Sequence, residues 1–207
     1  FLNNNNAGPI SSARLFFNEL NNNDYQQVVP QAPGPGLVAD MNSTIIINDG
    51  ILNTDGAAAV DISNSGIDIT FESVSVENSP DFGIRLVETN VLPSLNMFTI
   101  TGNGTPASGG IIQTTAPGVT TLDTGGIVLN NAGDVSLNHV LLDSNNRGIV
   151  VANSGLAIDD EQYLRLSNVQ VFDSELNAIN ATNLHELTIG ETSEFIGNGA
   201  AAVLADE

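Results

Sequence analysis

The sequence of 207 residues contains no cysteine, no lysine and no tryptophan. Without cysteine, the chain has neither a disulfide framework nor any thiol chemistry. Tyr25 and Tyr163 are its only tyrosines, so it offers few of the flat aromatic rings on which a sugar could stack. It also lacks any run close to the ~18 consecutive apolar residues of a membrane-spanning helix. These absences exclude a disulfide framework and thiol chemistry and argue against a membrane-spanning helix, while the redox compartment stays open.

Positive charge is scarce as well. The chain contains 24 acidic residues but only four arginines, which gives it a net charge of −20. The arginines are Arg14, Arg85, Arg147 and Arg165. Such a surface repels phosphate backbones and anionic lipid headgroups, so we expect no nucleic-acid binding and no membrane insertion. The balance is typical of secreted, marine or high-salt proteins, although a well-solvated exterior alone would also explain it. We predict an extracellular or cell-surface location.

What the sequence does contain is a repeat. Asn53, Asn78 and Asn103 follow one another at equal intervals of 25 residues. Each precedes a small-residue or Gly-Ile step, at 56–60, 83–86 and 109–112. A fixed period of this length indicates stacked supersecondary units, each of which buries its apolar side against its neighbours. We therefore predict one elongated repeat domain.

From Leu37 onward the pattern is one of short strands separated by turn residues, three per repeat. Ile67, Ile69 and Phe71 alternate with polar residues, which is the period of a strand with one buried face. Counting such units predicts an all-β solenoid of about six rungs. The predicted rungs span 44–62, 67–87, 91–113, 125–151, 164–179 and 187–204, with 114–124 as a loop or an expanded rung.

The chain divides into residues 1–36, a cap or connecting segment, and residues 37–207, the solenoid. Ser11 to Leu20 has the spacing of a short helix with a serine N-cap, which could cover the solenoid end. Leu15 to Phe17 could equally form another strand, and both alternatives remain open. The last residues, Ala205 to Glu207, predict no capping helix, so this end is either open to stacking or cut from a longer solenoid.

Two segments carry a family resemblance. Asn146 to Val151, followed by Leu166 to Val171, resembles the right-handed parallel β-helix repeat of pectate lyases, polygalacturonases, phage tailspikes and autotransporter passengers. A second resemblance is to the glycine-pair and Phe-x-x-Asn motifs of polymorphic outer membrane passengers, which are adhesins. It is found at residues 109–112, 125–128 and 195–198. The resemblance implies a right-handed triangular solenoid whose turn asparagines stack into a ladder.

The catalytic motifs of that family are largely missing. Asn53-Thr54-Asp55 matches an Asn-Thr-Asp motif of polygalacturonases, but the only Asp-Asp pair is the distant Asp159-Asp160, and the family's glycine-flanked histidine is absent. A pectate-lyase-like proton acceptor would have to be Arg85, Arg147 or Arg165. Inverting hydrolysis needs two carboxylates about 6.5–9.5 Å apart. We interpret Asp55, Asp159 and Asp160 as solvated surface, assign no catalytic residue and expect no enzyme.

The sequence does not contain a clear set of metal ligands either. Asn48-Asp49-Gly50 and 53–56 supply oxygen atoms but lack EF-hand spacing and its bidentate glutamate, and turns favour these residue types anyway. His139 and His185 have no cysteine or second histidine nearby, which argues against zinc. We assign no metal or cofactor site, with calcium at the turns as the alternative.

These features together predict an extracellular, non-enzymatic β-solenoid that serves as a structural or adhesive module. Its expected partners are further copies of itself, joined through the solenoid ends into fibres, and a host receptor or glycan. A polysaccharide lyase or glycoside hydrolase of the β-helix type and a phage tailspike segment are the alternatives.

Overall fold

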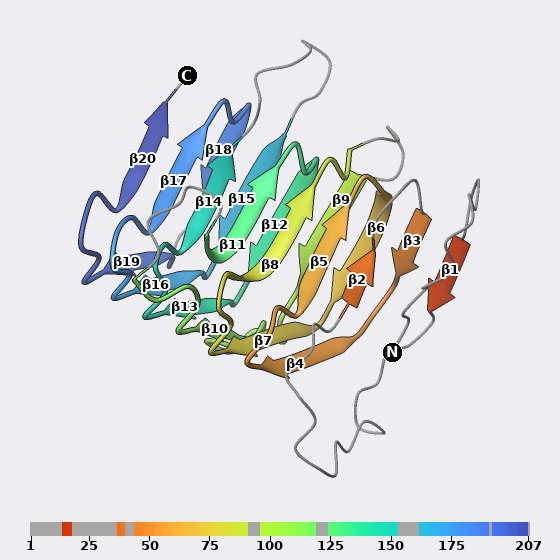
Figure 1. Ribbon diagram of the computed structural model, residues 1–207, viewed down its shortest axis with the longest axis horizontal. Helices are drawn as coiled ribbons and strands as arrows, with labels where there is room; N and C mark the ends of the chain where they lie inside the picture. The colour runs from red at the N-terminus through yellow and green to blue at the C-terminus, as the bar shows by residue number, and fades with distance from the viewer. Residues whose placement is uncertain are drawn as a thin grey trace.

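The chain folds into a right-handed parallel β-helix, which Figure 1 shows from the side. The computed structural model describes residues 14–17, 37–39, 44–90, 96–118, 124–152, 162–190 and 192–206. Six rungs of three strands follow one another along the axis, which confirms the predicted fold and rung number. None of the described residues belongs to a helix that is long and apolar enough to span a membrane.

The strands form three parallel sheets, each with one strand from every one of these six rungs; one further strand that precedes the rungs in the chain extends the first sheet, and another extends the third. The first sheet contains, in spatial order, β1 (Arg14–Phe17), β3 (Thr44–Ile47), β6 (Gly66–Phe71), β9 (Asn96–Ile100), β12 (Asp134–Asn138), β15 (Tyr163–Ser167) and β18 (Glu186–Ile189). The second contains β4 (Ile51–Asp55), β7 (Ser73–Glu77), β10 (Ile111–Gln113), β13 (Leu141–Asp143), β16 (Gln170–Phe172) and β19 (Glu194–Ile196). The third contains β2 (Leu37–Ala39), β5 (Val60–Ser63), β8 (Phe82–Val87), β11 (Gly125–Asn130), β14 (Ile149–Ala152), β17 (Ile179–Thr182) and β20 (Val203–Asp206).

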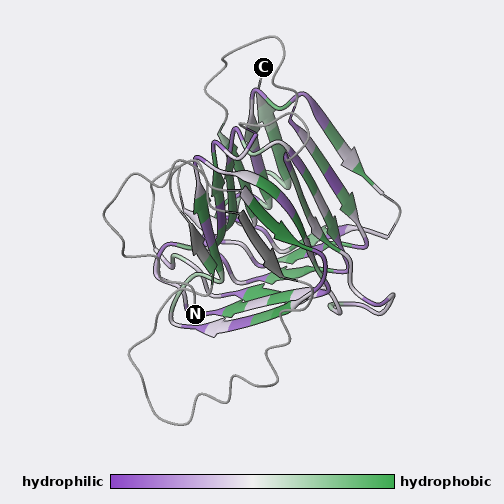
Figure 2. Cartoon of the chain, turned by 90° about the vertical axis from the view of Figure 1, so that its right-hand side faces the viewer, coloured by the Kyte–Doolittle hydropathy of each residue, from purple (hydrophilic) through white to green (hydrophobic). Residues whose placement is uncertain are grey.

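The core runs along the axis between the three sheets. Alternate side chains of each strand point inward, and Ile67, Ile69 and Phe71 of β6 are fully buried. Figure 2 looks along the axis of the β-helix and shows hydrophobic positions recurring along the strands of the sheets. Phe71 and Phe98 lie edge to face on neighbouring rungs, with ring centroids 6.0 Å apart. Each rung therefore buries its apolar side against the next, as the repeat predicted.

The structure decides between the helix and the strand alternatives for part of the N-terminal segment. Residues 14–17 form β1, which pairs in parallel with β3 and places Leu15 opposite Ile45. The helix alternative is thus wrong for these residues, because an extended backbone there satisfies the hydrogen-bonding groups at the edge of β3. The other residues of 1–36 lie outside the described part of the chain, and β1 places part of this segment in the first sheet.

The 25-residue asparagine interval does not correspond to one structural position. Asn53 lies within β4 opposite Ser75, Asn78 follows β7, and Asn103 lies in the connection between β9 and β10. The chain advances one rung in 24 residues between Asp61 and Arg85 but in 43 residues between Glu88 and Asn131. Connections of different lengths therefore break the fixed period, and the turn predicted at Asn53 begins instead at Gly56.

The repeat that does hold in three dimensions lies next to the first residue of the strands β5, β8, β11, β14, β17 and β20 of the third sheet. We call it the small-residue column: Ala59, Gly83, Gly126, Gly148, Ala178 and Ala202. A Cβ atom on Gly148 would lie only 2.4 Å from the carbonyl oxygen of Ala178, so the backbones pack closely here. Gly109-Gly110, expected to be equivalent, instead precedes β10 of the second sheet.

Every strand of the second sheet ends at a residue with left-handed backbone conformation. These turn residues are Gly56, Asn78, Thr114, Ser144, Asp173 and Gly197, with φ between 50° and 75°. Glycine, asparagine and aspartate adopt this conformation most readily, which explains the Asn- and Gly-rich texture of the sequence. The left-handed residue bends the chain out of the second sheet and toward the third.

One position later, the chain forms a ladder of small polar residues, which we call the polar ladder: Ser79, Thr115, Asn145, Ser174 and Asn198. The Asn145 side chain accepts hydrogen bonds from Thr115 N and Oγ1 (3.1 and 2.8 Å) and donates to Ile112 O (2.8 Å). Asn198 Oδ1 accepts from Ser174 N at 3.1 Å. Side-chain hydrogen bonds thus join neighbouring rungs at two places in this ladder, which mixes serine, threonine and asparagine and does not include the asparagines that set the 25-residue interval.

Candidate functional surfaces

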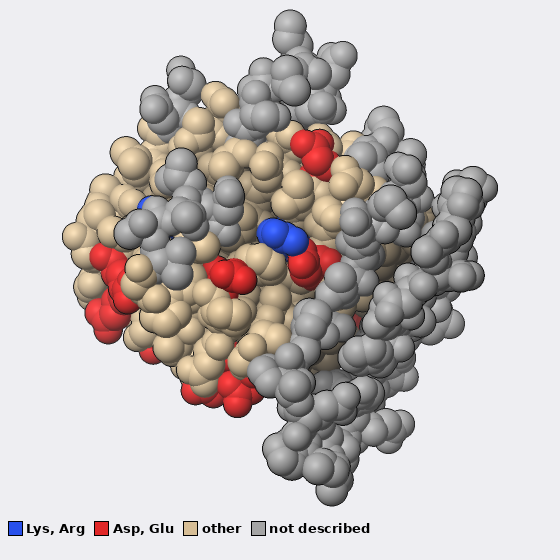
Figure 3. Space-filling view, in the orientation of Figure 1, with Lys and Arg blue, Asp and Glu red and all other residues tan. Residues whose placement is uncertain are grey.

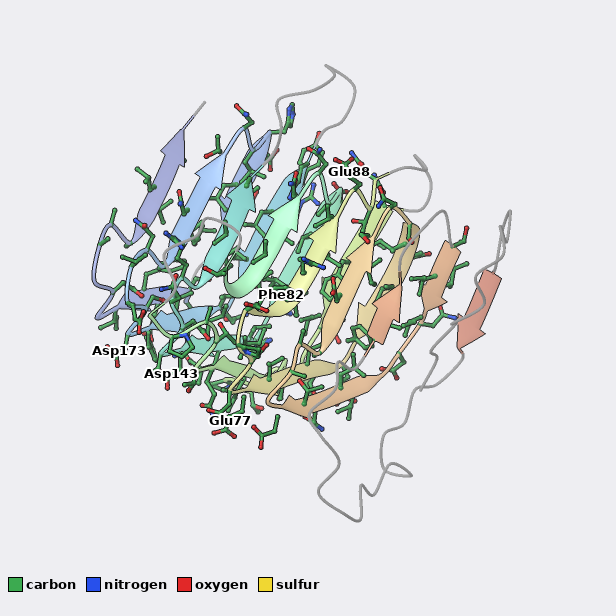
Figure 4. The ribbon with its side chains drawn as sticks, in the orientation of Figure 1. Glu77, Phe82, Glu88, Asp143 and Asp173 are labelled. Atoms are coloured by element: carbon green, nitrogen blue, oxygen red, sulfur yellow. The ribbon has the colours of Figure 1, made fainter. Side chains whose placement is uncertain are left out.

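Acidic side chains gather where the strands of the second sheet end. Asp55 lies opposite Glu77, Glu77 opposite Gln113, and Gln113 opposite Asp143 on successive rungs. Asp173 follows in the adjoining turn, and we call Asp55, Glu77, Asp143 and Asp173 the acidic edge. Figure 4 shows Glu77, Asp143 and Asp173 along this edge, and red gathers along the lower border in Figure 3. Neighbouring rungs are about 4.8 Å apart, so these carboxylates form a row of negative charge.

The Asn53-Thr54-Asp55 motif lies at the start of this edge. Asn53 is exposed, Thr54 Oγ1 donates a hydrogen bond to Ala57 O at 2.8 Å, and Asp55 Oδ1 accepts one from Asn78 Nδ2 at 3.1 Å. Thr54 thus closes the turn, and the amide of Asn78 holds the carboxylate of Asp55. The structure brings Asp55 next to Glu77, and Asp159 and Asp160 lie outside the described residues.

The three arginines considered as proton acceptors all have other partners, and that of Arg165 is the Asp134 carboxylate. Arg85 donates to both carboxylate oxygens of Asp61 at 2.8 and 2.9 Å and lies 4.5 Å from the centre of the Phe82 ring. Figure 3, in the orientation of Figure 1, shows basic atoms flanked by acidic atoms near the centre of the visible surface. Arg147 is buried and donates to Asn146 Oδ1 at 3.0 Å, and burial lowers the pKa of its guanidinium.

The residues considered for metal binding are separated from one another. His139 occupies a left-handed turn after β12, whereas His185 is exposed and packs edge to face on Tyr163. Asp49 Oδ1 accepts a hydrogen bond from the backbone of Gly50 at 2.8 Å, as a turn residue does. Across the described ranges, no three His, Cys, Asp or Glu side chains come together in a way that could hold a metal ion.

The outward side of the first sheet carries a regular row of hydroxyl groups. Thr70 lies opposite Thr99, and Thr99 opposite Ser136; Arg165 and Thr188 continue the row. All five side chains are accessible to solvent, and we call this row the hydroxyl face. Because parallel strands keep their register, donors and acceptors recur at about 4.8 Å along the axis.

A charged and aromatic group completes this face near its last rungs. The Arg165 guanidinium lies 4.8 Å from the centre of the Tyr163 ring and 3.7 Å from the Asp134 carboxylate. The Tyr163 ring also lies 5.1 Å from the His185 ring. An aromatic ring beside an arginine, an aspartate and several hydroxyls can contact a polyhydroxylated ligand through both its apolar and its polar faces.

Comparison with models of protein families, with curated proteins and with solved structures gave no match. Chemically, the acidic edge can attract cations and repel polyanions, and the hydroxyl face can form many weak hydrogen bonds. These two surfaces are the functional candidates that the fold itself provides.

Sequence reasoning missed most of both surfaces. Glu77 and Asp143 are far apart in the chain, and only the strand register places them in one row with Asp55. Thr70, Thr99 and Ser136 each occupy an outward position of a predicted strand, which the alternating pattern does reveal. Alignment of the strands by their inward residues, rather than by a fixed period, would have found the row.

Proposed function

We propose that this protein is an extracellular, non-enzymatic β-solenoid that serves as a structural or adhesive surface module. The hydroxyl face carries this proposal. It is a flat, solvent-accessible row of regularly spaced polar side chains on a rigid support, the arrangement that suits a ligand with repeating hydroxyl groups. The weaker resemblance of residues 109–112, 125–128 and 195–198 to polymorphic outer membrane passengers, which are adhesins, favours the same function.

The proposal predicts that the hydroxyl face binds glycans or a glycosylated receptor. Wild-type protein on a glycan array is expected to bind at least one polysaccharide class, and Ser136→Arg, at the centre of the row, is expected to abolish that binding. Asn53→Arg places the same bulk and charge on the exposed second sheet and should leave binding unchanged. A wild type that binds no glycan, or a fully active Ser136→Arg variant with native circular dichroism, would contradict the proposal.

Self-association forms the second part of the proposal. Strands β18, β19 and β20 are each at the edge of a sheet, and this last rung exposes Ile189, Ile196, Val203 and Leu204 by 40%, 59%, 37% and 49%. Open strand edges with apolar side chains favour pairing with the strands of another copy, head to tail. Electron microscopy at high protein concentration, with and without calcium, is expected to show fibres. Discrete short rods under all conditions would exclude this part and leave the lateral faces as the functional surfaces.

The enzyme alternative rests on the proximity of Asp55 and Glu77, which the register places side by side. Two neighbouring carboxylates are the minimum for glycoside hydrolysis. If the protein cleaves a polysaccharide, Asp55→Asn should abolish cleavage while Asp61→Asn, on the third sheet, should not. Absence of cleavage across acidic and neutral polysaccharides would remove this alternative.

A further inference from the structure

The sequence contains two Asn-Gly pairs, Asn103-Gly104 and Asn198-Gly199, and they lie in different structural surroundings. Asn103 and Gly104 are exposed in the connection between β9 and β10. Asn198 belongs to the polar ladder, where both of its side-chain ends form hydrogen bonds. The same chemical sequence is therefore present once in an open loop and once in a fixed position.

We propose that Asn103 is a site of spontaneous covalent modification, at which the side-chain amide is lost to a succinimide and then to aspartate and isoaspartate. The attacking atom is Gly104 N. Within the described part of the chain this atom has no hydrogen-bond acceptor, and no atom lies within 4 Å of the place where a Cβ would stand. A glycine in open space can move its nitrogen toward the neighbouring side chain at little cost.

The loop also stabilises the charge that develops during the reaction. Asn103 Oδ1 accepts hydrogen bonds from Thr105 N at 3.3 Å and from Thr105 Oγ1 at 2.9 Å. Ser108 holds the loop by accepting from Asn103 N at 2.9 Å and donating to Thr105 O at 2.6 Å. Two donors on the carbonyl oxygen polarise Cγ toward attack, as donors of an oxyanion hole do.

The chemistry balances without any cofactor. Solvent base removes the proton of Gly104 N, the bond from this nitrogen to Asn103 Cγ forms, and the electron pair of the carbonyl moves to Oδ1. Collapse of this intermediate breaks the Cγ–Nδ2 bond, and the nitrogen leaves as ammonia after taking a proton from water. A water molecule then opens the five-membered ring at either carbonyl, giving aspartate or isoaspartate. Each event consumes one water and adds one negative charge.

Asn198 is the internal control. Its Oδ1 accepts from Ser174 N, its Nδ2 donates to Val171 O, and Gly199 N donates to Ser174 O at 2.8 Å. A Cβ on Gly199 would lie 2.2 Å from Glu175 O, so this backbone has no room to move. At this second Asn-Gly pair, the side-chain carbonyl carbon of Asn198 and the backbone nitrogen of Gly199 are therefore each held in place, apart from one another.

The test is peptide mapping by mass spectrometry, with isoaspartate labelling, after incubation of the folded protein in mildly alkaline buffer. Asn103 is expected to convert at least about tenfold faster than Asn198, a difference of about 1.4 kcal/mol in the barrier. In denaturant the two sites should react at similar rates, because only the fold distinguishes them. Equal rates in the folded protein, or a faster reaction at Asn198, would overturn the proposal.

Two matched variants test the role of Thr105. Thr105→Val removes the hydroxyl donor and should slow conversion of Asn103 several-fold, whereas Thr105→Ser keeps the donor and should retain the rate. Thr105 is exposed, so neither substitution should disturb the core. If Thr105→Val and Thr105→Ser react equally fast, the hydroxyl does not assist and the assignment of Thr105 fails.

Discussion

The turn positions with left-handed backbone conformation restrict the choice of residue more than any other single positions in this chain. Asn78 and Asp173 suit the conformation, but Thr114 adopts it with φ 54° although its β-branched side chain crowds the backbone there. Thr114→Asn is therefore expected to raise the free energy of unfolding by about 1 kcal/mol, measured by chemical denaturation. The same replacement at Thr99, in strand β9, should lower stability instead. A destabilised Thr114→Asn variant would show that the threonine side chain has a compensating contact.

Asn145 of the polar ladder is the second decisive residue. It is fully buried, and three hydrogen bonds fix its side chain. Asn145→Ala leaves the Thr115 hydroxyl and the Ile112 carbonyl without this partner and should cost about 3 kcal/mol, by the usual cost of unsatisfied buried groups. The exposed Asn53→Ala serves as the control and should change stability little. Similar unfolding midpoints for the two variants would contradict the ladder's role.

At the scale of elements, the small-residue column decides how closely neighbouring rungs pack against one another along the third sheet. Gly148→Ala would place a methyl group 2.4 Å from Ala178 O and 2.5 Å from Val171 Cγ1. We expect a loss of about 3 kcal/mol, the upper range for overpacking, because the nearest atom belongs to the backbone. Gly104→Ala, in open space, should cost only the strain of a side chain at φ 93°, about 1–2 kcal/mol. Thermal unfolding of both variants measures the difference, and an unaffected Gly148→Ala variant would mean that the rungs can separate freely.

At the scale of the whole molecule, the net charge of −20 makes stability depend on salt. The acidic edge concentrates this repulsion, because Glu77 lies opposite Asp55, and Gln113 separates Glu77 from Asp143. Raising the ionic strength from 0.01 to 0.15 M shortens the screening length from about 30 Å to about 8 Å and should raise the unfolding temperature.

Two substitutions locate that effect on the edge. Glu77→Gln should raise the unfolding temperature at low salt by about 1–2 °C, because it removes one like-charge pair. Gln113→Glu should lower it, since it adds a carboxylate between two others. Calorimetry at low and high salt should show both differences shrinking as salt is added. Differences that persist at high salt would assign the effects to packing rather than to charge.

The sequence by itself determined the local structure of this protein. Alternation of Ile67, Ile69 and Phe71 with polar residues predicted a strand with one buried face, and the turn residues separated such strands into about six rungs. These signals are local, since side-chain alternation and backbone preference act over a few residues. The excess of negative charge is likewise a property of composition alone.

Only the tertiary structure decided which residues share a row. Connections between strands differ in length, so that hydrogen-bonded partners on neighbouring rungs lie 24, 30 or 43 residues apart. Asn53, Asn78 and Asn103 therefore separate despite their equal spacing, while Asp55 and Glu77 meet. The physical reason is that register follows from inward apolar side chains meeting across rungs, and a loop of any length that leaves them aligned costs little free energy.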